Sequence, residues 1–190
     1  MNRLCVYCGS SPGTDEVYAG AAKALGELLV AANIGLVYGG ASKGLMGIIA
    51  NTVLEAGGEV RGVIPRALEG KEIAHGGLTQ LHVVDSMHDR KSLMAVLADG
   101  FVALPGGFGT LEEIIEVLTW GQLQFHNKPC GLLNVDGYFD PLLAFFDNAR
   151  DRGFVRAEHR DMLIVADTAA ALLDRFEHYS PPAVEKWRSE

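Results

Sequence analysis

The sequence predicts an α/β fold in which a doubly wound parallel sheet carries helices on both faces. Short apolar, β-branched runs alternate along the chain with longer runs of helical periodicity. The short runs are apolar throughout rather than at every second residue, which is typical of strands that are buried on both faces. Right-handed crossovers then give a Rossmann-like arrangement, in which ligands bind beyond the carboxyl ends of the strands.

The elements follow in order along the chain. The expected strands are Leu4–Tyr7, Gly35–Tyr38, Val60–Ile64, Leu81–Val84, Phe101–Leu104, Gly131–Leu133 and Leu163–Val165. The expected helices are Glu16–Ala31, Leu45–Ala56, Ser86–Leu97, Thr110–Gln124, Phe139–Arg152 and Thr168–Tyr179. This order brings three glycine-containing loops to one edge of the sheet: Cys8–Gly13, Gly39–Gly44 and Pro105–Gly109.

Length and composition are those of one globular domain, expected over residues 1–180 and followed by a tail at 181–190 after the helix-stopping Pro181-Pro182. No apolar run reaches the ~18 residues of a membrane helix, and the first residues do not resemble a signal peptide. A net charge of −8 argues against a nucleic-acid partner. We therefore expect a cytoplasmic protein that binds neither membrane nor nucleic acid.

The cysteines give no metal-ligand pattern. Cys5-x-x-Cys8 spans the end of a strand, so its two thiols are read either as small buried side chains or as a redox or zinc pair. Cys130 stands alone in the sequence. We expect no metal and no cofactor, and a reducing compartment.

The most informative segment runs from Leu104 to Glu113, with the sequence LPGGFGTLEE. It joins an apolar strand to a helix through a glycine turn, which lets backbone N–H groups approach an anion. The first turn of the helix adds unpaired donors and a partial positive charge, so the segment predicts a phosphate site with two acids beside it. Thr110-x-x-Glu113 also fits a capping box, and both interpretations of Glu113 stay open.

Two further motifs are ambiguous when taken alone. The turn from Gly39 to Gly47 fits neither a Walker loop nor a dinucleotide fingerprint, so it is either an anion site or a tightly packed turn. Arg90 and Lys91 point about 100° apart on a helix. They form either a solvated surface pair or a pair in which one side chain faces the site, where arginine suits bidentate contact with phosphate.

Together these segments resemble the LOG family of cytokinin riboside 5′-monophosphate phosphoribohydrolases, whose members are often labelled lysine decarboxylases. The resemblance begins at Cys5-Val6-Tyr7-Cys8-Gly9-Ser10-Ser11 and includes Gly39-Gly40 and Gly44-Leu45-Met46-Gly47. It continues through Met87-His88-Asp89-Arg90-Lys91, the family's P-G-G-x-G-T-x-x-E at 105–113, Thr119-Trp120 and Lys128-Pro129, and ends at 131–138, GLLNVDGY. Residues Gly40-Ala41-Ser42-Lys43 depart from the family, in which many members have a third glycine and a valine.

The resemblance implies hydrolysis of the N-glycosidic bond of a purine riboside 5′-monophosphate, giving ribose 5-phosphate and a free base such as an N6-prenylated adenine, or adenine from AMP. It implies Arg90 and Glu113 as the catalytic pair, and a homodimer with the site between the chains. The positions that match substrate contacts are Glu72, Arg90, Lys91, Gly106, Gly107, Phe108, Gly109, Thr110, Leu111, Glu112 and Thr119.

Two other functions compete with this one. A non-catalytic nucleotide or cofactor carrier would use the glycine loops without an acid at a reacting carbon, so Arg90 and Glu113 together favour an enzyme. A pyridoxal-phosphate decarboxylase would need a Schiff-base lysine, and only Lys43 and Lys91 of the six lysines lie near the predicted site.

Overall fold

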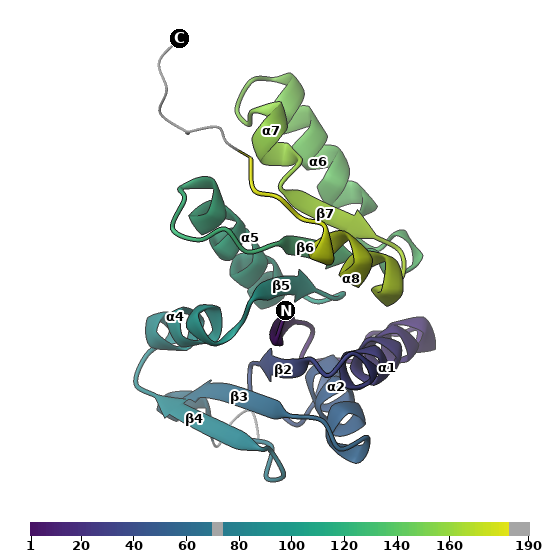
Figure 1. Ribbon diagram of the computed structural model, residues 1–190, viewed down its shortest axis with the longest axis vertical. Coiled ribbons are helices and arrows are strands. Elements are labelled where there is room, and N and C mark those ends of the chain that lie inside the picture. Colours follow the sequence, from purple (N-terminus) through teal and green to yellow (C-terminus); the bar gives the residue numbers. More distant parts are fainter. Residues whose placement is uncertain (70–73, 183–190) are drawn as a thin grey trace.

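The computed structural model describes residues 1–69 and 74–182 (Figure 1). The strands are β1 (Arg3–Tyr7), β2 (Gly35–Tyr38), β3 (Val60–Pro65), β4 (Gln80–Val84), β5 (Gly100–Ala103), β6 (Cys130–Leu133) and β7 (Leu163–Ala166). The helices are α1 (Glu16–Ala31), α2 (Gly44–Glu55), α3 (Arg66–Glu69), α4 (Met87–Leu97), α5 (Phe108–Gln122), the 3₁₀ turn η1 (Val135–Gly137), α6 (Asp140–Asp151), α7 (Ala157–Arg160) and α8 (Ala169–Glu177).

The seven strands form a single parallel sheet in the order β4-β3-β2-β1-β5-β6-β7. Strands β2, β5 and β6 are buried at every position, as their uninterrupted apolar sequences predicted. The chain first winds outward from β1 to β4 and then crosses back to β5 on the other side of β1. The strand order therefore reverses between β1 and β5, which is where a fold of this type binds its ligand.

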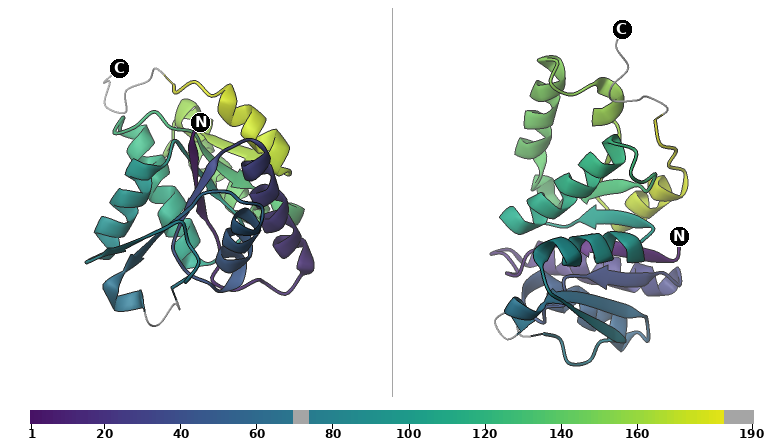
Figure 2. Two further views of the ribbon diagram at one scale, coloured as in Figure 1. Left: turned by 60° about the horizontal axis from the view of Figure 1, so that its bottom comes forward. Right: turned by 90° about the vertical axis from the view of Figure 1, so that its left-hand side faces the viewer.

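Helices cover both faces of the sheet (Figures 1 and 2). On one face, α1, α2 and α8 enclose a core that includes Leu4, Val6 and Leu36. On the other face, α4 and α5 enclose a second core around Cys5, Tyr7 and Phe101. Helices α6 and α7 lie at the β6–β7 end of the sheet. Over the part of the chain that the structure describes, none of the helices has the length and apolar character needed to span a bilayer.

Capping side chains set the starts of three helices. Asp15 accepts a hydrogen bond from Val17 N–H, Ser86 from Asp89 N–H and Thr168 from Ala171 N–H. These helices begin within one residue of the predicted positions. The short segments α3, η1 and α7 were not predicted, because each is too brief to give a periodic pattern.

Helix α5 begins earlier than predicted. Its N-cap is Gly107, whose position makes no side-chain cap, so Thr110 is the third helical residue and not the cap. The capping-box interpretation of Thr110 and Glu113 is therefore wrong. The first helical turn instead consists of the glycine-rich segment itself, Phe108-Gly109-Thr110, which leaves the helix end without a side-chain partner.

Candidate active site

The three glycine loops meet at the carboxyl edge of the sheet, where the strand order reverses. Gly9 N–H donates to the Pro105 carbonyl at 3.1 Å, and Leu45 N–H donates to the Gly9 carbonyl at 3.0 Å. These two bonds connect the loops after β1, β2 and β5 directly through their backbones. The loops form one backbone-lined surface, and not three separate turns.

Two glycines are required by this close packing. Gly44 has a φ of +60°, and a Cβ there would lie 2.3 Å from the Ser10 carbonyl carbon. A Cβ on Gly106 would lie 2.2 Å from Thr110 Oγ1 and 2.9 Å from the Gly9 nitrogen. Larger residues would therefore separate the loops. In the turn from Gly39 to Gly47, tight packing thus explains Gly44.

The start of α5 has free space around Gly107 and Gly109, which do not pack against the other loops. A Cβ built on Gly107 or Gly109 meets no atom within 4 Å, and Phe108 is 93% exposed. The first N–H groups of a helix have no acceptor within the helix and carry the positive end of its dipole. The N–H groups of Phe108, Gly109 and Thr110 are therefore candidates for binding an anion.

Arg90 lies buried beside this helix start. Its Nε donates to the Val63 carbonyl of β3 at 3.0 Å, and its Nη2 donates to the Gly39 carbonyl after β2 at 3.0 Å. Its Nη1 lies 3.6 Å from Glu113 Oε1, and the two side chains are only 7% and 12% exposed. The surface interpretation of Arg90 is wrong, because both strand ends hold its guanidinium in place.

Glu113 lies near the carboxyl end of β1 as well as near Arg90. Burial raises the pKa of the Cys8 thiol, and the negative charge of Glu113 raises this pKa further. Helix α5 therefore places the Glu113 carboxylate next to Arg90 and close to Cys8 at the end of β1. A carboxylate held in this way can stabilise positive charge that develops on a ligand beside it.

Lys91 is buried too, so the surface interpretation is also wrong for this residue. Its Nζ makes an ion pair with Glu112 and a second pair with Glu116 Oε1 at 3.0 Å. Burial alone would lower the pKa of Lys91, but the hydrogen bonds and charges of the two carboxylates outweigh it and raise this pKa. The amine joins α4 to α5 as a cation.

A cavity of about 330 Å³ opens at the point where the strand order reverses, next to Gly106 and Gly107. Its walls come from the loop after β1, the start of α1, the start of α2 and the turn after β6. It is lined by Gly9, Ser10, Ser11, Pro12, Gly13, Tyr18, Leu45, Pro105, Gly106, Gly107 and Tyr138. In the sequence, Ser10 and Ser11 belonged only to the motif that resembles the family, and no role was expected for Tyr18 or Tyr138. The segment at 131–138 was the available signal for Tyr138.

The other predicted contact positions are not all brought together. Leu111 is partly buried against the α4–α5 core, next to the loop. Thr119 lies about two turns beyond Leu111 along α5, and its hydroxyl donates to the Ile115 carbonyl at 2.7 Å. It faces a groove of about 150 Å³ between α5, α6 and α7. Glu72 lies outside the described residues.

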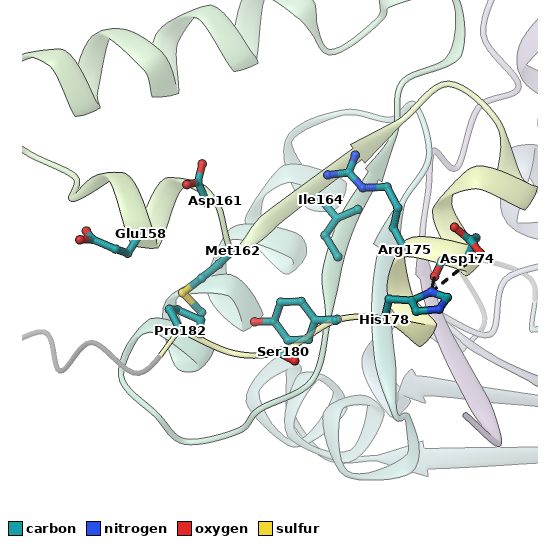
Figure 3. Close-up of a pocket in the computed structure, with 10 residues that line it drawn as sticks. Glu158, Asp161, Met162, Ile164, Asp174, Arg175, His178, Ser180 and Pro182 are labelled. Atoms are coloured by element: carbon teal, nitrogen blue, oxygen red, sulfur yellow. Dashed lines mark hydrogen bonds and ion pairs between the residues drawn. The ribbon is translucent and has the colours of Figure 1, made fainter.

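A larger hollow, of about 560 Å³, lies at the opposite edge of the sheet (Figure 3). Met162 precedes β7 there, Asp174 and His178 come from the end of α8, and Glu158 and Asp161 come from the α7 side. This hollow is remote from the glycine loops, since amino and carboxyl ends of parallel strands lie at opposite edges. None of the predicted site residues lines it.

All three cysteines are buried free thiols. Burial raises the pKa of Cys130 to about 12, and it raises those of Cys5 and Cys8 as well. Within residues 1–69 and 74–182, no three His, Cys, Asp or Glu side chains are arranged to hold a metal ion. Cys5 and Cys8 therefore act as small core side chains, Cys5 in the α4–α5 core and Cys8 in the α1–α2 core.

A family model described as "Possible lysine decarboxylase" matches residues 46–176. A protein of Oryza sativa subsp. japonica, named "Probable cytokinin riboside 5′-monophosphate phosphoribohydrolase", is 52% identical over 95% of this chain and 81% of its own length. A "Cytokinin riboside 5′-monophosphate phosphoribohydrolase" of Arabidopsis thaliana is 50% identical over 95% of this chain and 84% of its own. The chain belongs to the LOG family. The resemblance drawn from the sequence motifs is confirmed.

Solved structures support the fold of this LOG-family chain. The molybdenum cofactor carrier protein from Chlamydomonas reinhardtii matches with a TM-score of 0.71 at 24% identity, covering 94% of this chain and 99% of that one. The molybdenum cofactor binding protein from Rippkaea orientalis matches with a TM-score of 0.69 at 20% identity, covering 93% and 96%. At these identities the likeness establishes the doubly wound fold alone.

Proposed function

We propose that the protein hydrolyses the N-glycosidic bond of purine riboside 5′-monophosphates, releasing the free base and ribose 5-phosphate. The observation that carries this proposal is the buried Arg90–Glu113 pair, 3.6 Å apart, beside an open helix N-terminus. In this arrangement the start of α5, as a phosphate site, would share its ligand with the Glu113 carboxylate. The relatives at about 50% identity are named for this reaction on cytokinin ribosides.

The 5′-phosphate would bind at the start of α5. The N–H groups of Phe108, Gly109 and Thr110 supply donors there, and Gly107 and Gly109 leave room for the phosphate oxygens. A net charge of −8 gives the molecule no general attraction for anions, so this local site must provide the affinity. Binding energy at the phosphate would place the sugar for reaction at its C1′.

Glu113 would act at that carbon. When the bond between C1′ and the base nitrogen breaks, positive charge builds on the ribose, and a nearby carboxylate stabilises it. Water then adds to C1′, and the base leaves with a proton. Arg90 would hold Glu113 in place, because its guanidinium is itself fixed by the Val63 and Gly39 carbonyls. Arg90 would also contact the ribosyl phosphate or the leaving purine.

The alternatives fit the site less well. A carrier of the same fold would need the open loop but no buried ion pair at the reacting carbon. A Schiff-base decarboxylase would need a lysine that readily loses its proton, whereas the pKa of Lys91 is raised by Glu112 and Glu116. The second candidate lysine, Lys43, is exposed at the start of α2. The hydrolase is thus the function that these contacts support best.

We propose that the protein is a homodimer, and the position of Thr119 supports this proposal. Thr119 lies twelve residues beyond Gly107, about 18 Å along a helix that rises 1.5 Å per residue. This separation favours a contact from a second chain, so we propose that Thr119 of the partner subunit completes the site. Val96, Phe108 and Phe125 supply exposed apolar surface on or next to α4 and α5, which a second copy would cover.

The proposed reaction is tested with a panel of AMP, an N6-prenylated AMP, inosine monophosphate and the corresponding nucleosides, scored by chromatography for free base. Release of base from one or more monophosphates and from none of the nucleosides supports the proposal. Release from nucleosides at equal rates would contradict the phosphate site. Binding of a monophosphate without turnover would indicate the carrier.

The proposed dimer is tested by light scattering at micromolar concentration on the wild type and on Leu118→Glu, which places a charge in the groove beside Thr119. We expect a dimeric wild type and a weakened dimer in the variant. The matched control is Leu173→Glu on α8, on the opposite face of the sheet. A monomeric wild type would contradict the composite site.

A further inference from the structure

One side chain outside the predicted site contacts the Pro105–Gly109 loop, which leads into the proposed phosphate site. The Tyr138 hydroxyl donates a hydrogen bond to the Gly106 carbonyl at 2.7 Å. This contact joins the turn after β6 to the loop after β5 across 32 positions of sequence. Gly106 immediately precedes the N-cap of α5, so the bond acts on the peptide that leads into the proposed anion site.

The chain aims Tyr138 at this carbonyl by a specific turn. Asp136 and Gly137 have φ values of +52° and +69°, which reverse the chain after β6. The buried Asn134 closes the turn, because its Oδ1 accepts from Phe139 N–H and its Nδ2 donates to Asp140 Oδ1, both at 2.8 Å. The segment from Asn134 to Tyr138 therefore forms a turn that orients the Tyr138 side chain, a role that the proposed reaction does not include.

Ring contacts hold the side chain as well. The Tyr138 ring lies edge-on to Tyr18 of α1, with centroids 5.7 Å apart, and edge-on to Phe139 at 5.0 Å. Such contacts stabilise the ring independently of its hydroxyl. A Phe at this position would keep the packing and lose only the hydrogen bond to Gly106.

The hydrogen bond matters because a Gly–Gly peptide can turn over. Gly106 and Gly107 both lack a Cβ, and a Cβ on Gly107 would meet no atom within 4 Å, so the peptide between them can rotate more freely than one between larger residues. In a trans peptide the C=O and N–H point in opposite directions. A carbonyl bound to Tyr138 cannot turn toward the anion, whereas the reversed peptide would present its oxygen to a phosphate and repel it.

We propose that Tyr138 is a positioning residue for phosphate binding, which keeps the Gly106–Gly107 peptide in its anion-accepting orientation. The inference rests on the proposed phosphate site. It assigns to the turn after β6 a part in recognising the 5′-phosphate, without contact between Tyr138 and the reacting atoms.

The test compares wild type with Tyr138→Phe and with Tyr179→Phe, which removes a tyrosine hydroxyl at the end of α8, remote from the loop. Calorimetry measures the dissociation constants of ribose 5-phosphate and of inorganic phosphate, and kinetics on AMP separates KM from kcat. Loss of one hydrogen bond should raise the ribose 5-phosphate dissociation constant and the KM of Tyr138→Phe about 3- to 10-fold. Its kcat should change less than twofold, and Tyr179→Phe should match wild type.

The outcomes separate this inference from the proposed function. Wild-type affinities in Tyr138→Phe, with or without a lower melting temperature, would overturn the positioning role and leave the phosphate site standing. An equal loss of affinity for adenosine, which has no phosphate, would also overturn it. A wild type that binds neither ribose 5-phosphate nor AMP would contradict the proposed function itself, and the inference with it.

Discussion

Gly109 gives an unusual prediction: replacing it with alanine should stabilise the protein and weaken its binding of phosphate. Gly109 is the second residue of α5, where Gly costs about 0.5–1 kcal/mol relative to Ala in a helix. A Cβ there meets no protein atom within 4 Å, so no clash offsets this gain. For a chain of this size, the melting temperature of Gly109→Ala should rise by about 1–4 °C.

The same methyl group should hinder the ligand. A helical Cβ tilts toward the N-terminus of its helix, which in α5 is the side from which the anion approaches. Displacing the phosphate from one N–H donor forfeits about 1.5–3 kcal/mol, the range for hydrogen bonds to charged groups. The KM for AMP and the dissociation constant of ribose 5-phosphate should therefore rise about 10- to 100-fold.

Gly106→Ala is the contrasting variant. Its Cβ would lie 2.2 Å from Thr110 Oγ1 and 2.9 Å from the Gly9 nitrogen, so the loops must separate. We expect a loss of about 1–3 kcal/mol of stability, as for other overpacked sites. Differential scanning calorimetry and AMP kinetics on both variants are the assays. A Gly109→Ala protein with wild-type KM would refute the claim that phosphate approaches the first turn of α5.

Three further predictions address charged groups. Glu113→Gln should fold and bind AMP but lose at least about 100-fold in kcat, measured as base release, because the charge stabiliser is gone; near-native turnover would refute its role. Arg90→Lys should also lose at least about 10-fold in kcat, since an ammonium cannot replace the planar guanidinium between Val63 and Gly39; an unchanged rate would argue against a fixed guanidinium. Burial alone would raise the pKa of Asp99, but the N–H groups of Asn2 and Arg3 outweigh it and lower that pKa. Its stabilisation is therefore present above the unfolded value of about 3.9 and is lost as pH falls through the lower folded value. The melting temperature of Asp99→Asn should lie below that of wild type at pH 7, and the difference should shrink in acid as Asp99 of the folded wild type becomes protonated. An equal difference at neutral and acid pH would contradict this.

The strands could be predicted because strands that are buried on both faces have uninterrupted apolar sequences, such as Gly35–Tyr38. The start of α5 was predicted less accurately than the strands. Its N-cap is a glycine, and Thr110 matches the sequence pattern of a cap without acting as one. The helix therefore begins two residues earlier than expected, and Glu113 pairs with Arg90 and not with the helix end.

The burial of Arg90 was likewise hidden in the sequence. Its hydrogen-bond acceptors are the carbonyls of Val63 and Gly39, and backbone groups carry no residue identity that a motif could reveal. The contact of Tyr138 was hidden for the same reason, because its hydroxyl also donates to a backbone carbonyl. Sequence motifs indicated Arg90 and Glu113 as candidate site residues, whereas the structure was needed to find the backbone groups that orient Arg90.

The central claim is that the first turn of α5 holds a 5′-phosphate and thereby brings the ribose C1′ to Glu113. A crystal structure of Glu113→Gln with AMP tests this most directly, since the slowed variant should retain the intact nucleotide. We expect phosphate oxygens within hydrogen-bond distance of the N–H groups of residues 108–110, with C1′ next to the side chain at 113. A phosphate bound elsewhere, or an anomeric carbon remote from residue 113, would contradict it.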